Sequence, residues 1–407
     1  MAKHNHNVKG DVAIVGGGMV GLTLAIALGT SGLDVVVVDR EAPDTATGAK
    51  FDGRASAIAF SSVRMLEALG IWREVRQHQP ILDIRVSDGD SLLFLHYDHR
   101  QLGDTPMGQM VENRHFRQAL FARLAALPNV RLLAPEEVKT ADWRGARVQL
   151  QLQSGTEISA ELCIAADGAR SKLREQAGIG CAAWRYGQTG IVCTVHHKRP
   201  HHGVAHERFL PAGPFAILPL TGNRSSLVWT ERQEQAPAIL SLDEPDFLAE
   251  LRLRFGDHLG ELTVTGPRWS YPLGLHLADR YVDGRLALIG DAAHGIHPIA
   301  GQGLNLGLRD VAALAEVLVD ARRLGLDLGQ PWALDRYQRW RRFDALVLAV
   351  VTDALNRLFS NDLAPLQLAR DVGLALVDRA PPLKQFFMRH AMGSMGNLPK
   401  LLRGEAL

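Results

Sequence analysis

Three glycine-containing turns, each placed directly after a run of apolar residues, hold the side chains that could do chemistry in this chain. The first turn, residues 16–21, reads GxGxxG and follows the apolar residues 12–15. In such a turn Gly16 permits the sharp bend, Gly18 lets backbone approach a pyrophosphate, and Gly21 lets the next helix pack closely on the strand. The N-terminus of that helix would offer free N–H groups to the phosphates.

An acid stands where a dinucleotide's ribose would need one. Asp39 closes a second apolar run, residues 35–38, and its carboxylate could accept hydrogen bonds from ribose hydroxyls. Strand, turn, helix and terminal acid together predict dinucleotide binding. The motif alone leaves open whether the dinucleotide is FAD or NAD.

The other two turns are built in the same way. Asp167 begins DGARSKLR after the apolar residues 162–166, and Asp291 lies in GDAAH after residues 286–289. A carboxylate that leaves a parallel strand at this edge of a sheet can meet a ribose or ribityl hydroxyl. An N-cap of the next helix is the alternative role for Asp291. A further glycine-rich turn, residues 301–303, is expected to open another helix.

Composition limits the class of protein. The 407 residues suggest two or three domains, and 46% hydrophobic with 22% charged residues is typical of a globular chain with a large core. Lys and Arg total 45 against 44 Asp and Glu, so no overall charge favours nucleic acid. Cys163, Cys181 and Cys193 form no CxxC pair, which argues against a disulfide framework and a structural zinc site.

The same features bear on localisation. A reducing cytosol is the simplest compartment for three unpaired cysteines. Residues 1–10 contain no apolar run of the signal-peptide kind and are expected to form a frayed lead-in. Residues 12–33 carry no charge and are about long enough to cross a bilayer, but the glycines at 16–18 interrupt them. We therefore expect a cytoplasmic protein.

The three motifs in this order resemble the FAD-dependent aromatic hydroxylases, the single-component flavoprotein monooxygenases. GxGxxG, then DGxxSxxR at 167–174, then GDAAH with Pro298 and GQGxN at 301–305, cover the chain from residue 12 to about 318. Residues 54–72, 297–310 and 363–392 resemble one branch, the ubiquinone-biosynthesis hydroxylases. Asp39 stands where many relatives carry Glu, and the carboxylate is kept.

The resemblance implies an α/β fold: a discontinuous Rossmann-like FAD-binding domain, as in para-hydroxybenzoate hydroxylase, with a β-sheet-rich substrate domain and a helical C-terminal region. Apolar runs such as 191–195 and 215–220, separated by Gly, Pro and His, fit the substrate domain. The expected boundaries are 1–80, 105–184 and 272–330 for the FAD-binding domain, 81–104 for a hairpin of the substrate domain, 185–271 for that domain itself, and 331–407 for the C-terminal helices.

The resemblance also implies an activity. Its members use FAD, NAD(P)H as co-substrate and O2, and they pass oxygen to the ring through a flavin C4a-hydroperoxide that the protein keeps dry. No second GxGxxG follows a strand, so NAD(P)H is expected to bind transiently in a groove. The branch implies hydroxylation of a polyprenylated phenol in ubiquinone biosynthesis. A soluble phenol or aromatic acid as substrate, and a non-catalytic flavin-bearing scaffold, are the alternatives.

Residue by residue, the resemblance names the FAD contacts, whereas the candidate catalytic histidines are the titratable side chains of the segment and the family mechanism does not require a side-chain base. Arg54 is expected beside the flavin. His294 and His297 are the titratable side chains of the flavin-proximal segment and could assist phenol deprotonation, with structural hydrogen bonding as the alternative. The expected cofactor-binding residues are Gly16, Gly18, Gly21, Asp39, Arg40, Arg54, Arg114, Asp167, Asp291, Pro298, Gly301, Gln302, Gly303, Leu304 and Asn305.

On the substrate side the residues are less specific. Large apolar side chains of the predicted substrate domain could line the pocket, with a core role as the alternative. The expected pocket residues are Phe215, Leu218, Trp229, Tyr271 and Leu273. Five histidines within residues 196–206 fit no closed zinc pattern, so we expect a polar surface turn there and no metal.

The C-terminal part is expected to be helical over 332–351, 363–377 and 382–395. Aromatic and methionine side chains beside Lys384 and Arg389 could form an amphipathic face. That face would contact the inner face of the membrane peripherally, or other quinone-biosynthesis proteins. Packing on the FAD-binding domain is the alternative.

Overall fold

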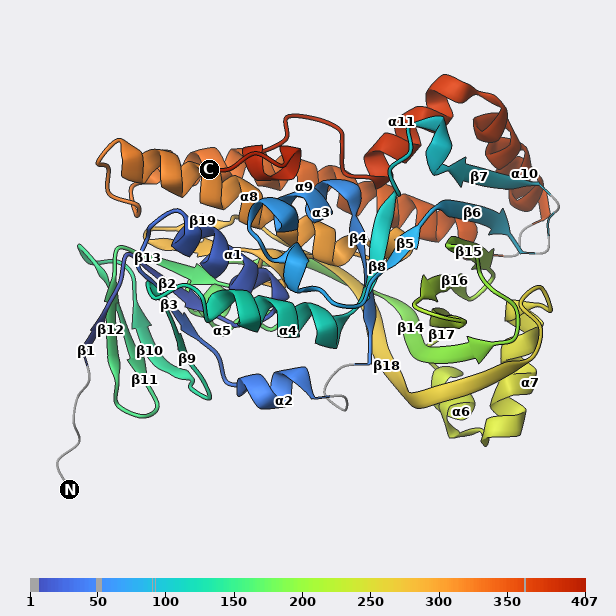
Figure 1. Ribbon diagram of the computed structural model, residues 1–407, viewed down its shortest axis with the longest axis horizontal. Coiled ribbons are helices and arrows are strands. Elements are labelled where there is room, and N and C mark those ends of the chain that lie inside the picture. The colour runs from blue at the N-terminus through green and yellow to red at the C-terminus, as the bar shows by residue number, and fades with distance from the viewer. Residues whose placement is uncertain (1–6, 49–52, 90, 92, 362–363) are drawn as a thin grey trace.

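The computed structural model describes residues 7–48, 53–89, 91, 93–361 and 364–407. Its first part is a six-stranded, mainly parallel sheet (Figure 1). In sheet order the strands are β19 (Val282–Asp283), β20 (Leu286–Leu288), β13 (Leu162–Ala165), β2 (Val12–Val15), β3 (Val35–Val38) and β9 (Val130–Leu133). The short apolar runs form parallel strands because both faces of this sheet are covered.

Helices cover one face of the parallel sheet. The first turn leads into α1 (Met19–Thr30), which packs between α4 (Asn113–Leu124) and α8 (Gln302–Arg323). The α8 helix is buried along most of its length, which fits its position between the sheet and α9. Two shorter helices follow other strands of this sheet. The α2 helix (Pro43–Thr47) follows β3, and α5 (Lys172–Gln176) follows β13.

A four-stranded sheet packs on the same core, and the sequence analysis did not predict it. Its order is β1 (Asn7–Lys9), β12 (Glu157–Ala160), β11 (Val148–Leu152) and β10 (Val138–Asp142). Val148, Leu150 and Ile158 join the core of the parallel sheet. The frayed lead-in predicted at residues 1–10 is therefore wrong for Asn7–Lys9, which pairs in parallel with β12. Residues 1–6 lie outside the described residues.

The second large sheet has eight strands and lies beside the parallel sheet. In order these are β21 (His294–Gly295), β18 (Leu262–Ala278), β14 (Cys181–His197), β17 (Arg224–Arg232), β16 (Gly213–Leu220), β15 (Val204–Leu210), β6 (Asp83–Asp88) and β7 (Phe94–Asp98). All neighbours are antiparallel except β15 and β6. One face is covered by α6 (Ala236–Ser241) and α7 (Glu244–Phe255), which lie below it in Figure 1.

A smaller sheet lies between the two large sheets. A three-stranded sheet of β4 (Ala55–Ala59), β8 (Gly108–Glu112) and β5 (Gln79–Ile81) stands there, followed along the chain from β4 by α3 (Phe60–Ala68). Short 3-10 turns complete the connections: η1 (Trp72–Glu74), η2 (His99–Gln101), η3 (Gly290–Ala292) and η4 (Ile299–Gly301).

The C-terminal helices are α9 (Pro331–Phe359), α10 (Ala364–Arg379) and α11 (Pro381–Ala391), followed by η5 (Lys400–Arg403). The α10 helix packs on β6 and β7, whereas η5 returns to α3 and α8, where Leu401 and Leu402 are buried in the core of the parallel sheet. Among the described residues, no helix is long and apolar enough to span a membrane. The domain boundaries remain a prediction, although β14 and β18 run beyond the ends set for the substrate domain.

Candidate active site

The three glycine-containing turns meet at one cleft of about 410 Å³. Strands β2, β13 and β20 lie side by side, so the turns that follow them converge at one edge of the sheet. Residues from α1, β4, α4 and the start of α8 complete the wall. The lining residues are Gly18, Met19, Val20, Gly21, Arg54, Ala55, Ser56, Asn113, Arg117, Ala166, Gly168, Ile289, Gly290, Asp291, His294, Gly295, Ile296, Gly303 and Leu304.

The glycines of the first turn fall into two kinds. A Cβ on Gly16 would lie 2.2 Å from the carbonyl oxygen of Ala166, and Gly16 has φ +111°. A Cβ on Gly21 would lie 2.0 Å from the carbonyl oxygen of Gly16. Both positions therefore exclude side chains through backbone packing. A Cβ on Gly18 would meet no atom within 4 Å, so this glycine keeps open the space at the N-terminus of α1.

That helix end offers unpaired donors to the cleft. Gly18 is the N-cap of α1 and provides no side-chain cap, and the first turn of the helix contains no acidic residue. Gly303, in the first turn of α8, also borders open space. Two helix N-termini with small residues at their tips suit an anionic group such as a pyrophosphate.

Asp39, the acid predicted to bind ribose, lies at the end of β3 and is held by two backbone hydrogen bonds. The Asp39 carboxylate accepts hydrogen bonds from the backbone N–H of Gly17 and from that of Glu41, the latter at 2.7 Å. It thereby links the first turn to the end of the second strand. Arg40 is exposed and pairs with Glu41 at 3.7 Å, and it does not line the cleft.

The acids of the other two turns differ in position. Asp291 lies in η3, is exposed, and borders the cleft, while its backbone carbonyl accepts a hydrogen bond from His276 Nε2 at 2.7 Å. Asp167 instead accepts from the backbone N–H of Lys172 at 2.9 Å, at the start of α5. Arg174 donates to the carbonyl oxygen of Ala292 at 3.0 Å and so fastens the second motif to the third.

Of Arg54 and Arg114, both predicted to support FAD binding, one lines the cleft and the other does not. Arg54 lines the cleft, and its guanidinium lies 4.7 Å from the ring centroid of Tyr271. Arg114 does not line the cleft, and pairs with Glu112 at 3.3 Å. Arg117, one turn further along α4, is buried and does line it. The three-residue spacing to Arg114 is the signal that could have found Arg117, since both stand near the same side of a helix.

His294 belongs to a buried charged network. Its Nε2 lies 2.6 Å from Asp310 Oδ2, and Arg341 Nε donates to Asp310 Oδ1 at 2.7 Å. Asp310 also accepts the backbone N–H of Gly290 at 2.9 Å, which fixes the third turn from behind. Burial raises the pKa of Asp310, but His294 and Arg341 outweigh it, so that this pKa lies below its usual value. This network supports the structural alternative for His294.

His297 is also buried, without a charged partner. Its Nε2 lies 3.3 Å from Gln188 Oε1, and its Nδ1 has no hydrogen-bond partner among the described residues. Burial lowers the pKa of His297 to about 4, so the ring is neutral near pH 7. A neutral imidazole with one open nitrogen can accept a proton only weakly, and the residue does not line the cleft.

The glycine-rich turn before α8 is held by its asparagine. Gly301 has φ +63° and caps α8, as the predicted turn requires. The Asn305 side chain accepts from the backbone N–H of Ala59 at 2.8 Å and donates to the carbonyl oxygen of Ala57 at 2.8 Å. Asn305 therefore ties α8 to β4. Pro298 precedes η4, Gln302 begins α8, and only Gly303 and Leu304 of this segment line the cleft.

The predicted substrate residues divide between the two faces of the eight-stranded sheet. Phe215 and Trp229 pack with Phe247 of α7, on the face away from β4, so the structure places them in a core rather than in a pocket wall. Leu218 packs with Ala55 and Ala57 on the other face. Tyr271 lies under Arg54, and Leu273 is buried. Strand alternation sets this division.

The histidine-rich segment is not the predicted surface turn throughout. His197 is fully buried at the end of β14, with its two ring nitrogens at 2.7 Å from the carbonyl oxygen of Arg199 and 3.1 Å from Ser225 Oγ. His196 and His202 are exposed. Alternation along the strand turns His197 inward, where polar partners satisfy it. Within the described residues no group of three or more His, Cys, Asp and Glu side chains is arranged to hold a metal ion.

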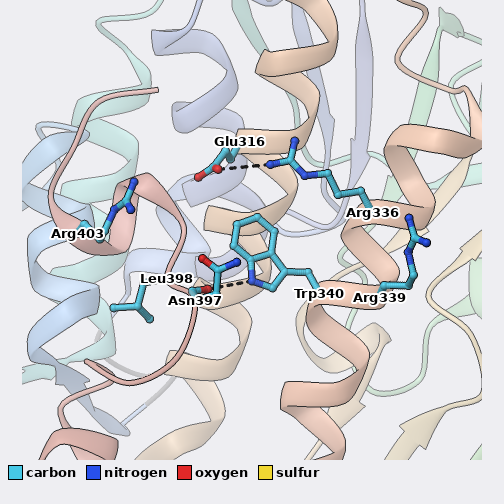
Figure 2. Close-up of a pocket in the computed structure, with 7 residues that line it drawn as sticks. All are labelled: Glu316, Arg336, Arg339, Trp340, Asn397, Leu398 and Arg403. Carbon is cyan, nitrogen blue, oxygen red and sulfur yellow. Dashed lines mark hydrogen bonds and ion pairs between the residues drawn. The ribbon is translucent and has the colours of Figure 1, made fainter.

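The cleft fits the adenine dinucleotide of a flavin. The open space at Gly18 and the uncapped end of α1 suit the pyrophosphate. Asp39 after β3 and Asp291 after β20 supply carboxylates on either side of β2 and β13. Arg117 adds a positive charge at the wall. A second pocket of about 440 Å³ lies elsewhere, between α8, α9 and the C-terminal segment, around Trp340 (Figure 2).

Comparison with known proteins identifies the family of the chain. The family described as FAD binding domain matches residues 9–350. The chain is 55% identical over 401 residues to ubiquinone hydroxylase UbiL of Rhodospirillum rubrum, covering 98% of this chain and 93% of that protein. It is 37% identical to 3-demethoxyubiquinol 3-hydroxylase of Escherichia coli, covering 95% of this chain and 99% of that protein.

Solved structures support the fold alone. p-Nitrophenol 4-monooxygenase PnpA from Pseudomonas putida superposes with a TM-score of 0.80 at 23% identity, covering 96% of this chain and 100% of that chain. Klebsiella pneumoniae HpxO complexed with FAD and uric acid gives a TM-score of 0.71 at 18% identity, covering 97% and 98%. The α/β fold with a Rossmann-like FAD-binding domain is thus confirmed, and the chain belongs to the ubiquinone-biosynthesis hydroxylases within the FAD-dependent aromatic hydroxylases.

Proposed function

We propose that this protein hydroxylates the aromatic ring of a polyprenylated phenol in ubiquinone biosynthesis, with FAD as cofactor and NAD(P)H and O2 as co-substrates. The observation that carries the proposal is the 55% identity to a ubiquinone hydroxylase across nearly the whole of both chains. Three motif turns that converge on one cleft supply the matching flavin site.

The residues of the cleft have separate tasks in this proposal. Gly18 and the start of α1 hold the pyrophosphate, Asp39 the adenosine ribose, and Asp291 the ribityl chain, while Gly303 at the start of α8 places helix N–H groups beside the flavin ring. Bound FAD supplies the capacity to take hydride from NAD(P)H and to activate O2. Arg54, stacked on Tyr271, closes the wall between the cleft and β18 and helps to exclude water.

We also propose the following division into domains. The FAD-binding domain comprises 1–80, 105–184 and 272–330, the substrate domain 81–104 and 185–271, and the C-terminal helices 331–407. The position of β6 and β7 at the edge of the eight-stranded sheet supports the second assignment. The buried Leu401 and Leu402 argue that the last residues belong with the core of the FAD-binding domain.

The experiment that tests the function is lipid analysis of cells that lack this protein. We expect ubiquinone to fall and a prenylated phenol that lacks one oxygen to accumulate, as measured by mass spectrometry. The intact gene should reverse both changes, whereas an Asp291→Ala version should not, because Asp291 borders the flavin cleft. Normal ubiquinone without an accumulated phenol, in cells with no second hydroxylase, would refute the assignment and favour a soluble aromatic substrate.

An exposed apolar face supports peripheral membrane contact. Five large side chains of α9, spaced by three and four residues, are each at least 40% exposed. They are Phe343, Leu346, Val347, Val350 and Val351. A surface of this extent on one helix face is typical of an interaction site, because scattered apolar residues do not line up at helical spacing.

The charges around this face favour an anionic membrane. Arg339 and Arg342 are exposed directly before Phe343, and Arg389 is exposed on α11 beside Phe386 and Phe387. Figure 2 shows Arg339 and Trp340 on α9, while Arg336 in the same view is paired with Glu316 at 3.7 Å and Arg403 pairs with Glu405 at 2.8 Å. A basic and apolar surface of this kind binds anionic lipid headgroups and inserts into the acyl boundary. It would also bring the enzyme to a lipid-tailed phenol.

Vesicle sedimentation tests the membrane face. Wild-type holoenzyme should pellet with vesicles of mixed zwitterionic and anionic phospholipid, and less in high salt. A Phe343→Ser, Val350→Ser double variant should stay in the supernatant, while Leu253→Ser, an equally exposed leucine on α7, should pellet as wild type does. Equal pelleting of all three proteins, or binding only to a partner protein, would overturn the membrane assignment.

A further inference from the structure

One carboxyl group on the eight-stranded sheet has no role in the site described above. Glu207 lies in the middle of β15, between Ala205 and Phe209. Because side chains alternate along a strand, these three share one face of the sheet, and His206 and Arg208 take the other. His206 and Arg208 contact His258 and Arg254 on the α7 side, which confirms the division.

The neighbours of Glu207 place it opposite the flavin-binding segments. Ala205 packs in a cluster with Ile81 and Met110 that includes Ala55 and Ala57 of β4. Phe209 packs with Ile299 of η4 and with Phe359 of α9. Glu207 therefore stands on the sheet face between β4, which follows Arg54, and η4, which precedes the glycine-rich turn of α8.

The carboxyl group is enclosed but not satisfied. Its side chain lies deep among protein atoms, yet it keeps some accessible surface, and no hydrogen bond or ion pair to it occurs within the described part of the chain. Burial raises the pKa of Glu207 to about 8, with no charged group contributing. A carboxyl group that is partly enclosed by apolar neighbours, has no protein partner among the described residues and keeps accessible surface is placed to contact a ligand.

The charged groups on the surrounding elements are already engaged. Asp88 of β6 pairs with Arg370 of α10 at 2.6 Å, and Glu112 of β8 pairs with Arg224 at 3.2 Å. Strands β4 and β16 and turn η4 carry no titratable side chain, and His297, just before η4, is neutral near pH 7 because burial lowers its pKa to about 4. The remaining charges near β15 are Arg85, Arg208, His206 and His258, which interact with one another on the opposite face.

We propose that Glu207 contacts the hydroxyl group of the phenol substrate and takes its proton. This inference rests on the proposed function, because it requires a phenol in the space between the sheet and the flavin. The O–H bond of the phenol breaks, an O–H bond forms on the Glu207 carboxylate, and the electron pair stays on the phenol oxygen. The resulting phenolate is a stronger carbon nucleophile at the ring positions ortho and para to the oxygen.

The placement also explains why neither histidine of the motif is needed for this step. His294 is bound to Asp310, and burial lowers the pKa of His297 to about 4, which makes it a weak base. Glu207 offers a base whose pKa lies near the working pH, which is where general base catalysis is most effective. A single carboxyl group facing an apolar wall also orients an amphipathic phenol by its one polar edge.

The first test measures kcat/KM against pH for hydroxylation of a geranylated phenol by the holoenzyme. The wild type should show one ionisation, with kcat/KM rising to a plateau above about pH 8. Glu207→Gln should lose that ionisation and fall by ~10²-fold to 10⁴-fold at the plateau, the usual contribution of a positioned base. Its FAD content should equal that of the wild type, because Glu207 does not line the dinucleotide cleft.

A matched control is available in the same sheet. Glu231 of β17 is buried on the opposite face, where it pairs with Arg254 at 3.4 Å. Glu231→Gln should lower stability but keep the wild-type pH profile. If Glu207→Gln keeps the wild-type profile and plateau as well, the inference is overturned.

A second measurement separates this inference from the proposed function. A geranylated nitrophenol absorbs at different wavelengths as phenol and as phenolate, so its binding spectrum reports the proton directly, without turnover. Titrated between pH 5 and pH 8, the bound nitrophenol should show a pKa below its free-solution value in the wild type, because the Glu207 carboxyl group holds the shared proton and donates it to the phenolate oxygen. In Glu207→Gln the bound ligand should titrate with its free-solution pKa. A wild type that oxidises no prenylated phenol would refute the function, while equal spectra for both proteins would refute the role of Glu207.

Discussion

Two carboxyl groups, the buried Asp310 and the partly buried Glu207, have opposite surroundings. Asp310, behind the flavin-binding turns, meets His294, Arg341 and the backbone of Gly290, and its pKa is lowered. Glu207, on the substrate side, meets no partner within the described residues, and burial raises its pKa to about 8. A carboxylate whose hydrogen-bond and charged partners are all supplied by the protein stabilises the fold, whereas a carboxyl group without such partners is available to a ligand.

The glycines of the first turn show the same contrast without charge. Gly21 lies against the carbonyl oxygen of Gly16, so its surroundings are full. Gly18, three residues earlier, borders open space. The packed positions support the fold and the open positions receive the ligand. Substitutions at the two kinds of position should therefore separate stability from binding.

The largest effect is expected at the packed carboxylate. Asp310→Ala leaves Arg341 and His294 buried without their common partner, which should cost ~3–5 kcal/mol of unfolding free energy. Chemical denaturation of the purified protein measures it. Tyr337, buried on the same side with its hydroxyl donating to the carbonyl oxygen of Leu288 at 2.7 Å, supplies a control. Tyr337→Phe removes one neutral hydrogen bond and should cost ~1 kcal/mol; equal losses would contradict the central place given to Asp310.

The next effect separates Gly21 from Gly18. Gly21→Ala forces a Cβ to 2.0 Å from a backbone oxygen, so we expect a destabilised protein that also binds FAD poorly. Gly18→Val should fold with wild-type stability as apoprotein, because its Cβ meets nothing, yet lose FAD affinity by tenfold or more, since the side chain occupies the pyrophosphate position. Thermal unfolding of the apoproteins and fluorescence titration with FAD distinguish the two. A Gly18→Val protein with full FAD affinity would show that the cleft binds elsewhere.

The sequence predicted the residues of the glycine-containing turns better than the residues that line the cleft and the substrate side. The order of strand, GxGxxG turn, helix and acid constrains backbone directly, so the glycines, Asp39 and Asp291 lie where the motifs indicated. Arg117 and Glu207 belong to no motif, because their importance depends on which face of a helix or strand they occupy and on what packs there. Phe215 and Trp229 fail for the same reason: large apolar side chains suit a core as well as a pocket.

The last comparison is the pH dependence of stability, in which the two carboxyl groups should differ in the pH range over which stability is lost. The folded pKa of Glu207, about 8, lies above its model-compound value of 4.5, so the folded chain keeps a proton that the unfolded chain releases. Its contribution to stability is therefore present below pH 4.5 and is lost as pH rises towards 8. Glu207→Gln removes this loss, and the variant should gain stability relative to wild type between pH 5 and pH 8.

Asp310 provides the opposite slope. Its folded pKa lies below 3.8, so its contribution is present above that value and is lost only as pH falls further. From pH 5 to pH 8 Asp310 is ionised in both states, and the deficit of Asp310→Asn should stay constant while the advantage of Glu207→Gln grows. Denaturation midpoints of the three holoproteins at pH 5, 6.5 and 8 decide this. Parallel curves for wild type and Glu207→Gln would mean that Glu207 is already partnered in the folded protein, and would remove the reason to assign it to the substrate.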